Sequence, residues 1–407
     1  MNNKIKLAVA GAVLASASVA NAGITWTAGD WTVDMNGNVN AFAAQTHASD
    51  SNTVNGGLAG TKGNDSDSVG INTGLLPSWL GFTATTRQND IDTSVTISFQ
   101  PGAGNTKALA GGNSNNAATE NRQAFLTFGD KSWGSVKVGK DLGIFGSTAI
   151  LNDMTLLGVG AGSVSAGNTT TLGRIGTGYV YADWIGQIAY TTPNMNGFQA
   201  TLGIVQPWKA NTALSTTTVS SGSSGTNDEF GFQGQASYSW TGDFAGKAWA
   251  GFMSQNVENI ASTGANTSET STGFEAGVSA SVMNINLVAY GYSGDGLGTT
   301  SLLGDAFDTT GKARDSDGGY VQATYVIPMG TKLGVSYGVS KLDDNAIDTG
   351  AVRGTLVKEN NMLTIGAYHP LTKHLNLVAE FSDVESKNYL SQSNDSQTIA
   401  LGAILFF

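Results

Sequence analysis

The sequence predicts an all-β protein, a sixteen-stranded antiparallel transmembrane β-barrel. Three observations lead to this prediction. Apolar and polar residues alternate along most of the chain, which is the period of a strand with two unlike faces. The connections alternate between short turns and long polar loops, a rhythm typical of barrels that span a membrane. The alternation continues into the last two residues, Phe406 and Phe407, where most chains fray.

The N-terminal segment, residues 1–22, is predicted to be a secretory signal peptide. Two lysines precede an apolar run from Leu7 to Ala17, and the sequence Ala20-Asn21-Ala22 fits a cleavage site. The run is too short to span a bilayer. We therefore expect an exported protein whose mature part, residues 23–407, is a single domain.

The composition argues against several classes of protein. Charged residues make up 13% of the chain, against roughly 25% in ordinary soluble domains. There is no cysteine, so no disulfide can hold the exported chain together. The net charge of -11 argues against a nucleic-acid partner. No apolar stretch of about 18 residues follows the signal peptide, so no transmembrane helix is expected.

The strands are predicted from the alternation, segment by segment. In residues 91–100, for example, Ile91, Val95 and Phe99 lie on one face, and polar residues such as Gln100 lie on the other. Sixteen such segments are expected, near residues 31–45, 79–88, 91–100, 121–129, 133–140, 178–191, 197–206, 229–241, 244–257, 272–282, 284–293, 319–327, 331–341, 361–369, 374–384 and 396–407.

A soluble β-sandwich would also alternate, but three features argue against it. A sandwich of this length would need two or three domains, and the composition has no break that would mark a linker. Its outward face would carry Lys and Glu, whereas the polar face here is Asn, Ser, Thr, Gln and Gly. The regular change between short and long connections fits a membrane barrel, whose wall must close on itself. At sixteen strands the wall cannot fill the interior with its own side chains, so we expect a water-filled channel with a hydrophilic wall.

Several segments resemble the general porins of Gram-negative outer membranes, and the resemblance covers essentially the whole mature chain. The segment RQAFLTFGDKSWGSVKVGKDLGIFG (122–146) resembles that family's fourth strand, turn, fifth strand and entry to the third loop. YTTPNMNGFQATLG (190–203) is similar to its strand-turn-strand unit, and AYHPLTKHLNLVAEF (367–381) to the hairpin that joins its strands fourteen and fifteen. LNDMTLLGVGAG, followed by TTLGRIGTGYVY, is similar to a porin subgroup. The order and spacing of these motifs together are specific.

This resemblance implies a function and a set of partners. The chain would be a porin in the cell outer membrane of a Gram-negative bacterium, a channel for passive diffusion of ions and small hydrophilic solutes. It would form a homotrimer among outer-membrane lipids and lipopolysaccharide, with its third loop folded into the lumen. Phe407 would be the assembly signal that the barrel-assembly machinery reads. No cofactor is expected.

Charged side chains that point into the lumen are the candidate selectivity residues. Lys137 lies between Val136 and Val138, which face lipid, so Lys137 faces inward. The alternation also places Arg87 inside, near a turn. For Arg122 the alternation is ambiguous, and only the resemblance places it on the basic inner wall.

The remaining candidates lie beside or within the third loop, roughly residues 143–174. Lys140 closes its strand, where a bulge could turn it inward. Asp141 lies at the base of the loop, Asp153 lies within it, and Arg174 lies at its end. The resemblance implies several carboxylates in this loop, but the sequence offers only Asp153. The small excess of basic residues predicts an open, weakly selective channel that leans toward anions.

Two other functions stay open at the level of the sequence. A substrate-selective channel would carry a ladder of Arg or Lys, or a track of aromatic residues, and neither is clear. A non-conducting adhesin or structural barrel would have binding loops and no open pore. An enzyme or a metal site is not expected, because the three His lack converging ligands or an orienting acid. The acidic stretches 64–68, 313–319 and 341–348 are interpreted as solvated loop charge, with Ca²⁺ binding as the alternative.

Overall fold

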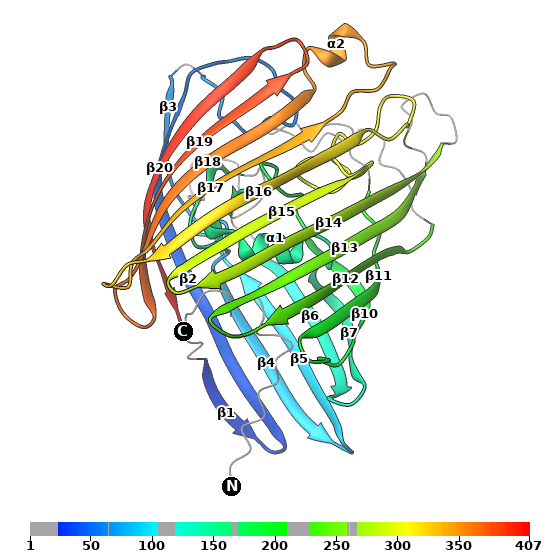
Figure 1. Cartoon of the computed structure of the whole chain (residues 1–407), viewed down its shortest axis with the longest axis vertical. Coiled ribbons are helices and arrows are strands. Elements are labelled where there is room, and N and C mark those ends of the chain that lie inside the picture. Colours follow the sequence, from blue (N-terminus) through cyan, green and yellow to red (C-terminus); the bar gives the residue numbers. More distant parts are fainter. Residues whose placement is uncertain are drawn as a thin grey trace.

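The computed structural model describes residues 23–63, 65–104, 119–164, 170–209, 228–258, 260 and 267–407, so the predicted signal peptide lies outside the described residues. Sixteen strands form an antiparallel sheet that closes on itself, as predicted (Figure 1). These wall strands are β2 (Trp31–Ala48), β4 (Trp79–Gln88), β5 (Ile91–Gln100), β6 (Glu120–Asp130), β7 (Gly134–Leu142), β10 (Trp184–Thr191), β11 (Phe198–Val205), β12 (Gly231–Trp240), β13 (Phe244–Glu258), β14 (Ser268–Val282), β15 (Ile285–Asp295), β16 (Asp315–Val326), β17 (Lys332–Leu342), β18 (Val357–Pro370), β19 (Leu375–Asn388) and β20 (Ser393–Phe406). Each predicted segment corresponds to one of them, in order. In the described part of the chain, no helix is long and apolar enough to cross a membrane.

Strand β2 closes the barrel. It pairs with β20 on one side and with β4 on the other, and its 18 residues extend beyond both partners. Two short strands that the sequence analysis missed cover the remaining edges. β1 (Ile24–Ala28) pairs with the first part of β2, and β3 (Asp67–Asn72) pairs with its last part. This pairing matters because an unpaired backbone group in hydrocarbon costs several kcal/mol.

The chain's last residues complete the closure. The backbone of Phe407 exchanges two hydrogen bonds with Gly37 of β2, at 2.9 and 3.0 Å. Phe406 is buried on the inner side, in a cluster with Phe42, while Leu405 is exposed on the outer side. The end of the barrel that holds the C-terminus also holds the short turns (Figure 1), and we call it the turn end and the opposite one the loop end.

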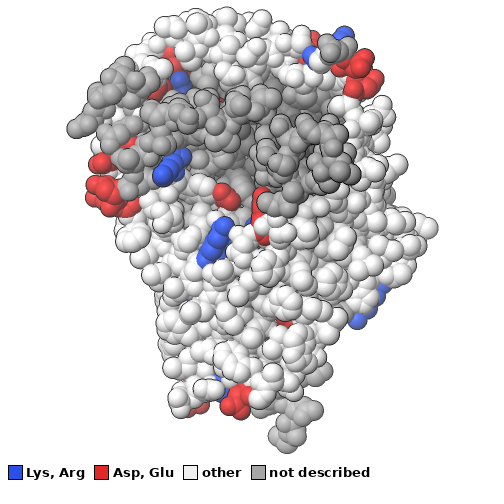
Figure 2. All heavy atoms as spheres, turned by 180° about the vertical axis from the view of Figure 1, so that it is seen from behind, with Lys and Arg blue, Asp and Glu red and all other residues white. Residues whose placement is uncertain are grey.

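The two faces of the wall differ as the alternation predicts. Exposed apolar side chains lie on the outer face, among them Val39, Leu126, Leu202, Val321, Ile365 and Leu401. Buried polar side chains lie on the inner face, among them Asn40, Thr96, Gln187, Ser336, Thr364 and Thr398. Figure 2 shows Lys, Arg, Asp and Glu over the upper half of the face in view and at its lower tip, with a largely uncharged band between them. Such a band matches the hydrocarbon layer of a membrane.

The inner face is not polar throughout, which corrects the expectation of a hydrophilic wall all around. Along β13 to β16, the buried side chains of Trp249, Met253, Tyr290 and Tyr320 form one apolar cluster with residues of the segment after β7, including Ile150. The sequence analysis missed this cluster because its large inward residues are scattered over several strands and meet only when the sheet curves.

At the loop end, a buried ion pair organises two of the acidic stretches. The guanidinium of Arg314 binds both carboxylate oxygens of Asp348, at 2.7 and 3.0 Å, and donates to the backbone oxygens of Asp305 and Phe307. The side chains of Arg314 and Asp348 are 5% and 2% exposed. The arginine side chain thus neutralises the charge of the Asp348 carboxylate.

This ion pair predicts a pH dependence of loop order. Burial would raise the pKa of Asp348, but hydrogen bonds from Arg314 and from the Asn345 amide outweigh it and hold the pKa below its ordinary value. The stabilisation is therefore complete above the ordinary value of about 3.9 and is lost as the pH falls through the lowered pKa. The protection of the backbone amides of residues 296–314 against hydrogen exchange, relative to an unfolded chain at the same pH, should stay constant from neutral pH down to about 5.

Asp348→Asn should speed this exchange at neutral pH, because breaking a buried ion pair costs about 3–5 kcal/mol. Asp344→Asn is the matched control. Asp344 pairs with Arg353, which is 46% exposed, and such pairs contribute less than about 1 kcal/mol. Equal exchange rates in the two variants would contradict the proposed role of the buried pair.

The contacts of the C-terminus predict the effect of changing it. Phe407→Asp, or deletion of Phe407, should leave export intact and block insertion, because a charge would replace the aromatic ring at the edge of the hydrocarbon layer. Phe407→Tyr, which keeps the ring, is the control. The measurement is the heat-modifiable band of the folded barrel in outer-membrane fractions. A normal band from Phe407→Asp would be incompatible with this account.

Candidate functional site

The segment after β7, residues 143–182, lies against buried side chains of the wall. It contains α1 (Ser147–Asn152), η1 (Met154–Leu157), β8 (Ala161–Val164) and β9 (Thr171–Gly173). Gln233 of β12 accepts a hydrogen bond from the Ile144 amide at 2.8 Å, and Tyr320 of β16 donates one to the Ala149 carbonyl at 2.8 Å. In Figure 1, α1 is seen behind the strands β13 to β16. Part of the segment lies outside the described residues, so the infolding of the complete third loop stays a prediction.

Glu275 of β14 holds the start of α1. Its carboxylate accepts hydrogen bonds from the Gly146 amide at 3.0 Å, the Tyr290 hydroxyl at 2.9 Å and the Gln235 side chain at 3.1 Å. Gly146 precedes α1 with a φ of 79°, which a residue with a side chain rarely adopts. The glutamate thus satisfies a backbone donor at the point where the chain turns into the helix.

Glu380 of β19 holds the segment beyond η1 in the same way. Its carboxylate accepts hydrogen bonds from the amides of Val159 at 2.6 Å and Gly160 at 2.9 Å, and from the Tyr368 hydroxyl at 2.5 Å. Glu275 and Glu380 are both buried, and they are not among the residues that the sequence analysis selected. Their inward position could have been read from the alternation, but their partners lie far away in the sequence.

Asp153 and Arg174 meet in the interior, with 0% of either side chain exposed. The Asp153 carboxylate accepts hydrogen bonds from the Thr155 amide at 2.9 Å and the Tyr179 hydroxyl at 2.8 Å. Arg174 donates to the carbonyls of Met362 and Ser336, at 3.0 and 3.1 Å. The structure therefore brings these two predicted residues together, but in a buried cluster rather than on an open channel wall.

Arg87 lies near the turn between β4 and β5. Its guanidinium is 2.8 Å from the carboxylate of Asp92 and 2.9 Å from that of Asp130. The register pairs Arg87 with Asp92, whose neighbours on the same face, Ser94 and Thr96, are buried. Arg87 therefore lies on the inner face, but two carboxylates accompany its charge.

Arg122 of β6 is buried because of an irregularity in the ladder. Ser98 pairs with Gln123, but Gln100 pairs with Glu120, so the β6 strand carries an extra residue at this point. The alternation alone was ambiguous for Arg122 because Phe125 and Phe128 lie on opposite faces, and the bulge is what places Arg122 inside. Its Nε donates to the Glu120 carboxylate at 2.8 Å.

Lys137 and Asp141 of β7 share the inner face and form an ion pair with each other. The ammonium of Lys137 also lies 5.1 Å from the centre of the Phe125 ring. Lys140 differs from our expectation, because the ladders on both sides of β7 continue through it without a bulge. Lys140 lies two residues after Val138 and therefore points to the same, outer face. Its ammonium donates to the Asn121 carbonyl at 2.9 Å.

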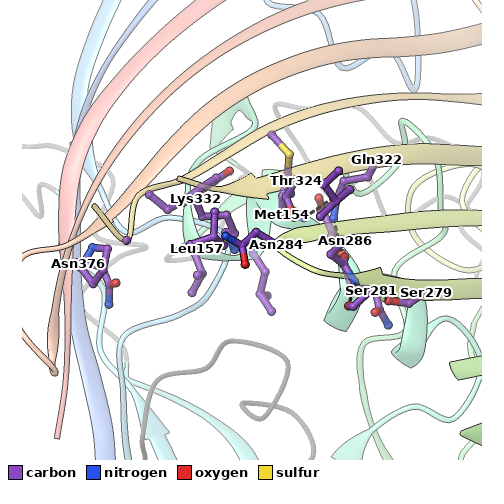
Figure 3. A pocket seen from close by; sticks show the side chains of 18 of the residues that line it. Met154, Leu157, Ser279, Ser281, Asn284, Asn286, Gln322, Thr324, Lys332 and Asn376 are labelled. Atoms are coloured by element: carbon purple, nitrogen blue, oxygen red, sulfur yellow. Dashed lines mark hydrogen bonds between the residues drawn. The ribbon is translucent and has the colours of Figure 1, made fainter. Parts of the chain in front are cut away.

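A cavity of about 740 Å³ opens below α1 and η1, at the turn end of the barrel (Figure 3). Lys332 of β17 lines it, with its ammonium 4.7 Å from the centre of the Tyr368 ring. Lys247 of β13 faces inward nearby, in register with Ser279, which also lines the cavity. Within the described ranges, neither lysine forms an ion pair with a carboxylate.

Neither lysine was predicted from the sequence as a pore residue, although the alternation of apolar and polar residues indicates the inward position of Lys332. Leu333 and Val335 are exposed on the outer face, so the alternation that placed Lys137 also places Lys332 inside. Lys247 stands among small residues and aromatic residues of both faces, where the alternation is weak. As for metal chemistry, the residues that the structure describes contain no cluster of three or more His, Asp or Glu that could hold an ion.

The comparisons with known proteins agree with this architecture. A family model described as Gram-negative porin matches residues 8–389. The chain belongs to the Gram-negative porin family. It is an outer-membrane diffusion channel, which the closed barrel and the uncharged outer band support. A comparison with curated proteins gives no significant match.

Solved structures share the fold at low sequence identity. The outer membrane channel DcaP of Acinetobacter baumannii is 16% identical, with a TM-score of 0.69, over 95% of this porin and 99% of that chain. An anion-selective porin from Comamonas acidovorans is 15% identical, with a TM-score of 0.62, over 93% of this porin and 100% of that chain. OmpT of Vibrio cholerae, in a structure described as the trimer form, is 14% identical, with a TM-score of 0.52, over 93% and 99%.

The hydrogen bonds of Glu380 predict that it restrains the segment after β7. Glu380→Gln should raise the current noise of single channels and lower the free energy of unfolding by about 1–3 kcal/mol, because the amides of Val159 and Gly160 lose their anionic acceptor. Glu385→Gln is the control on the same strand. Glu385 pairs with the half-exposed Lys387 at 2.7 Å, and its loss should matter little. Quiet currents and unchanged stability in Glu380→Gln would refute the role of this carboxylate.

Proposed function

We propose that the porin passes small hydrophilic solutes with a weak preference for anions, and that it has no enzymatic activity. The observation that carries the proposal is the distribution of charge inside the barrel. The inward cations Arg87, Arg122 and Lys137 each have a carboxylate partner within hydrogen-bonding distance. Lys247 and Lys332 have none among the described residues, so they are the inward cations whose charge no ion pair offsets.

Local charge should outweigh the charge of the whole chain. The net charge of -11 favours cations, but salt of about 0.1 M screens exposed charges over about 10 Å. Fixed charges inside a narrow, low-dielectric lumen act at close range on every passing ion. The fold is shared with a porin described as anion-selective, which supports the same direction.

We further propose that the turn end faces the periplasm and that the porin assembles as a homotrimer. The lipids of the outer membrane, including lipopolysaccharide, would surround it, and the barrel-assembly machinery would recognise Phe407. Two observations support these proposals. Exposed apolar side chains cover the outer face, and one protein of the same fold is described in a trimer form.

The charge assignment predicts the selectivity of the open channel. In planar bilayers with a salt gradient, the wild type should show a reversal potential that favours anions, and the preference should shrink as the salt concentration rises. Lys332→Glu should shift the reversal potential toward cations. Lys341→Glu is the matched control, because Lys341 lies on the same strand but is exposed near the loop end.

Three results would contradict the proposal. A wild type that prefers cations would show that the charges of Lys247 and Lys332 do not control selectivity. Equal shifts in Lys332→Glu and Lys341→Glu would show that the position of the charge is irrelevant. Absence of any conductance would favour a structural or adhesive barrel over a channel.

A further inference from the structure

We propose that the cavity below α1 and η1 is a binding site for small organic anions that carry an apolar body. This inference rests on the proposed anion preference and deepens it, because it names a solute class and a place in the lumen. The cavity volume of about 740 Å³ lies within the range of about 300–1,000 Å³ that is typical of ligand sites.

The charge that the cavity presents is positive. The charged residues among its lining are Lys332, Lys373 and Asp153. The Asp153 side chain is 0% exposed, and its oxygens are already occupied by Thr155 and Tyr179. An anion in the cavity would therefore meet two ammonium groups and no open carboxylate.

Lys332 is held in position by its surroundings. Its ammonium lies over the ring of Tyr368, and the hydroxyl of Tyr368 donates to Glu380 at 2.5 Å. Glu380 in turn accepts hydrogen bonds from the backbone amides of Val159 and Gly160, so its carboxylate is already engaged. A rigid cation of this kind binds an anion with little loss of side-chain freedom.

Apolar side chains line the cavity beside Lys332, and polar side chains line it farther along the wall. Leu156 and Leu157 of η1 line the cavity, and Figure 3 shows Leu157 and Lys332 beside the same space. Asn286 donates to Ser281 at 2.9 Å, and both line the cavity farther along the wall. A carboxylate near Lys332 with an apolar body against the leucines matches this arrangement. Chloride or acetate would contact the ammonium groups but would have no apolar body to place against the leucines.

Benzoate is a suitable probe, with benzamide as its neutral analogue and acetate as the anion without an apolar body. In planar bilayers with oriented channels, benzoate added at the turn end should reduce the ion current at concentrations about tenfold lower than acetate or benzamide require. Lys332→Gln should raise the half-blocking concentration of benzoate about tenfold. Lys332→Arg should retain most of the block.

Lys341→Gln is the control for a general loss of positive charge, because Lys341 lies on the same strand away from the cavity. Lys373→Gln is a second variant in an exposed turn, where folding is not at risk, and it should weaken the block more modestly. Equal block by benzamide, equal block by acetate, or a block that neither Lys332→Gln nor Lys373→Gln weakens would overturn the proposed site.

The outcomes also separate this site from the proposed function. A wild type that prefers anions but shows no block by benzoate at the turn end would refute the binding site alone. A wild type that conducts but prefers cations, or that does not conduct, would refute the selectivity proposal on which the site rests.

Discussion

The whole structure depends on the pairing of backbone groups within a membrane. In hydrocarbon there is no water to satisfy an amide or a carbonyl, so a sheet that spans it must have no free edge. Strand β2 meets this constraint by pairing with β20 and β4, and β1 and β3 pair with the parts of it that extend beyond them. The terminal residue Phe407 belongs to this closure, because its backbone pairs with Gly37. The aromatic pair at the end of the chain is thus part of the wall.

Closure at sixteen strands creates a second problem, since wall side chains cannot fill so wide an interior. Here the described part of the segment after β7 packs against the inner face of the wall. One side of it packs against the aromatic cluster of β13 to β16, and the buried carboxylates of Glu275 and Glu380 bind its backbone. A buried carboxylate is unfavourable unless it is fully hydrogen-bonded, which explains why each one has three donors.

The sequence predicted the wall better than the interior, and the reason is physical. Each wall strand shows its two faces within a few residues, so the segment 91–100 could be recognised without knowledge of its neighbours. The interior depends on contacts between residues far apart in the chain. Arg122 required knowledge of a bulge, and the backbone amides that Glu380 binds are at sequence separations of 221 and 220. The alternation with Leu333 and Val335 shows that Lys332 faces inward. Its importance, however, depends on a cavity that only the folded barrel contains.

The central claim is that a wall carboxylate, Glu380, holds the segment after β7 against the inner face of the wall. The chain has no cysteine, so Gly158→Cys combined with Glu380→Cys would introduce the only two thiols. A Cβ at position 158 would lie 2.2 Å from the carboxyl carbon of Glu380, so residue 158 faces the space that this side chain fills, and Glu380→Cys vacates that space for a disulfide. Single-channel recording of this variant is the most direct measurement. The account predicts quiet currents when the disulfide is formed and noisy currents after reduction. Failure of the two thiols to cross-link, or equal noise in both states, would contradict it.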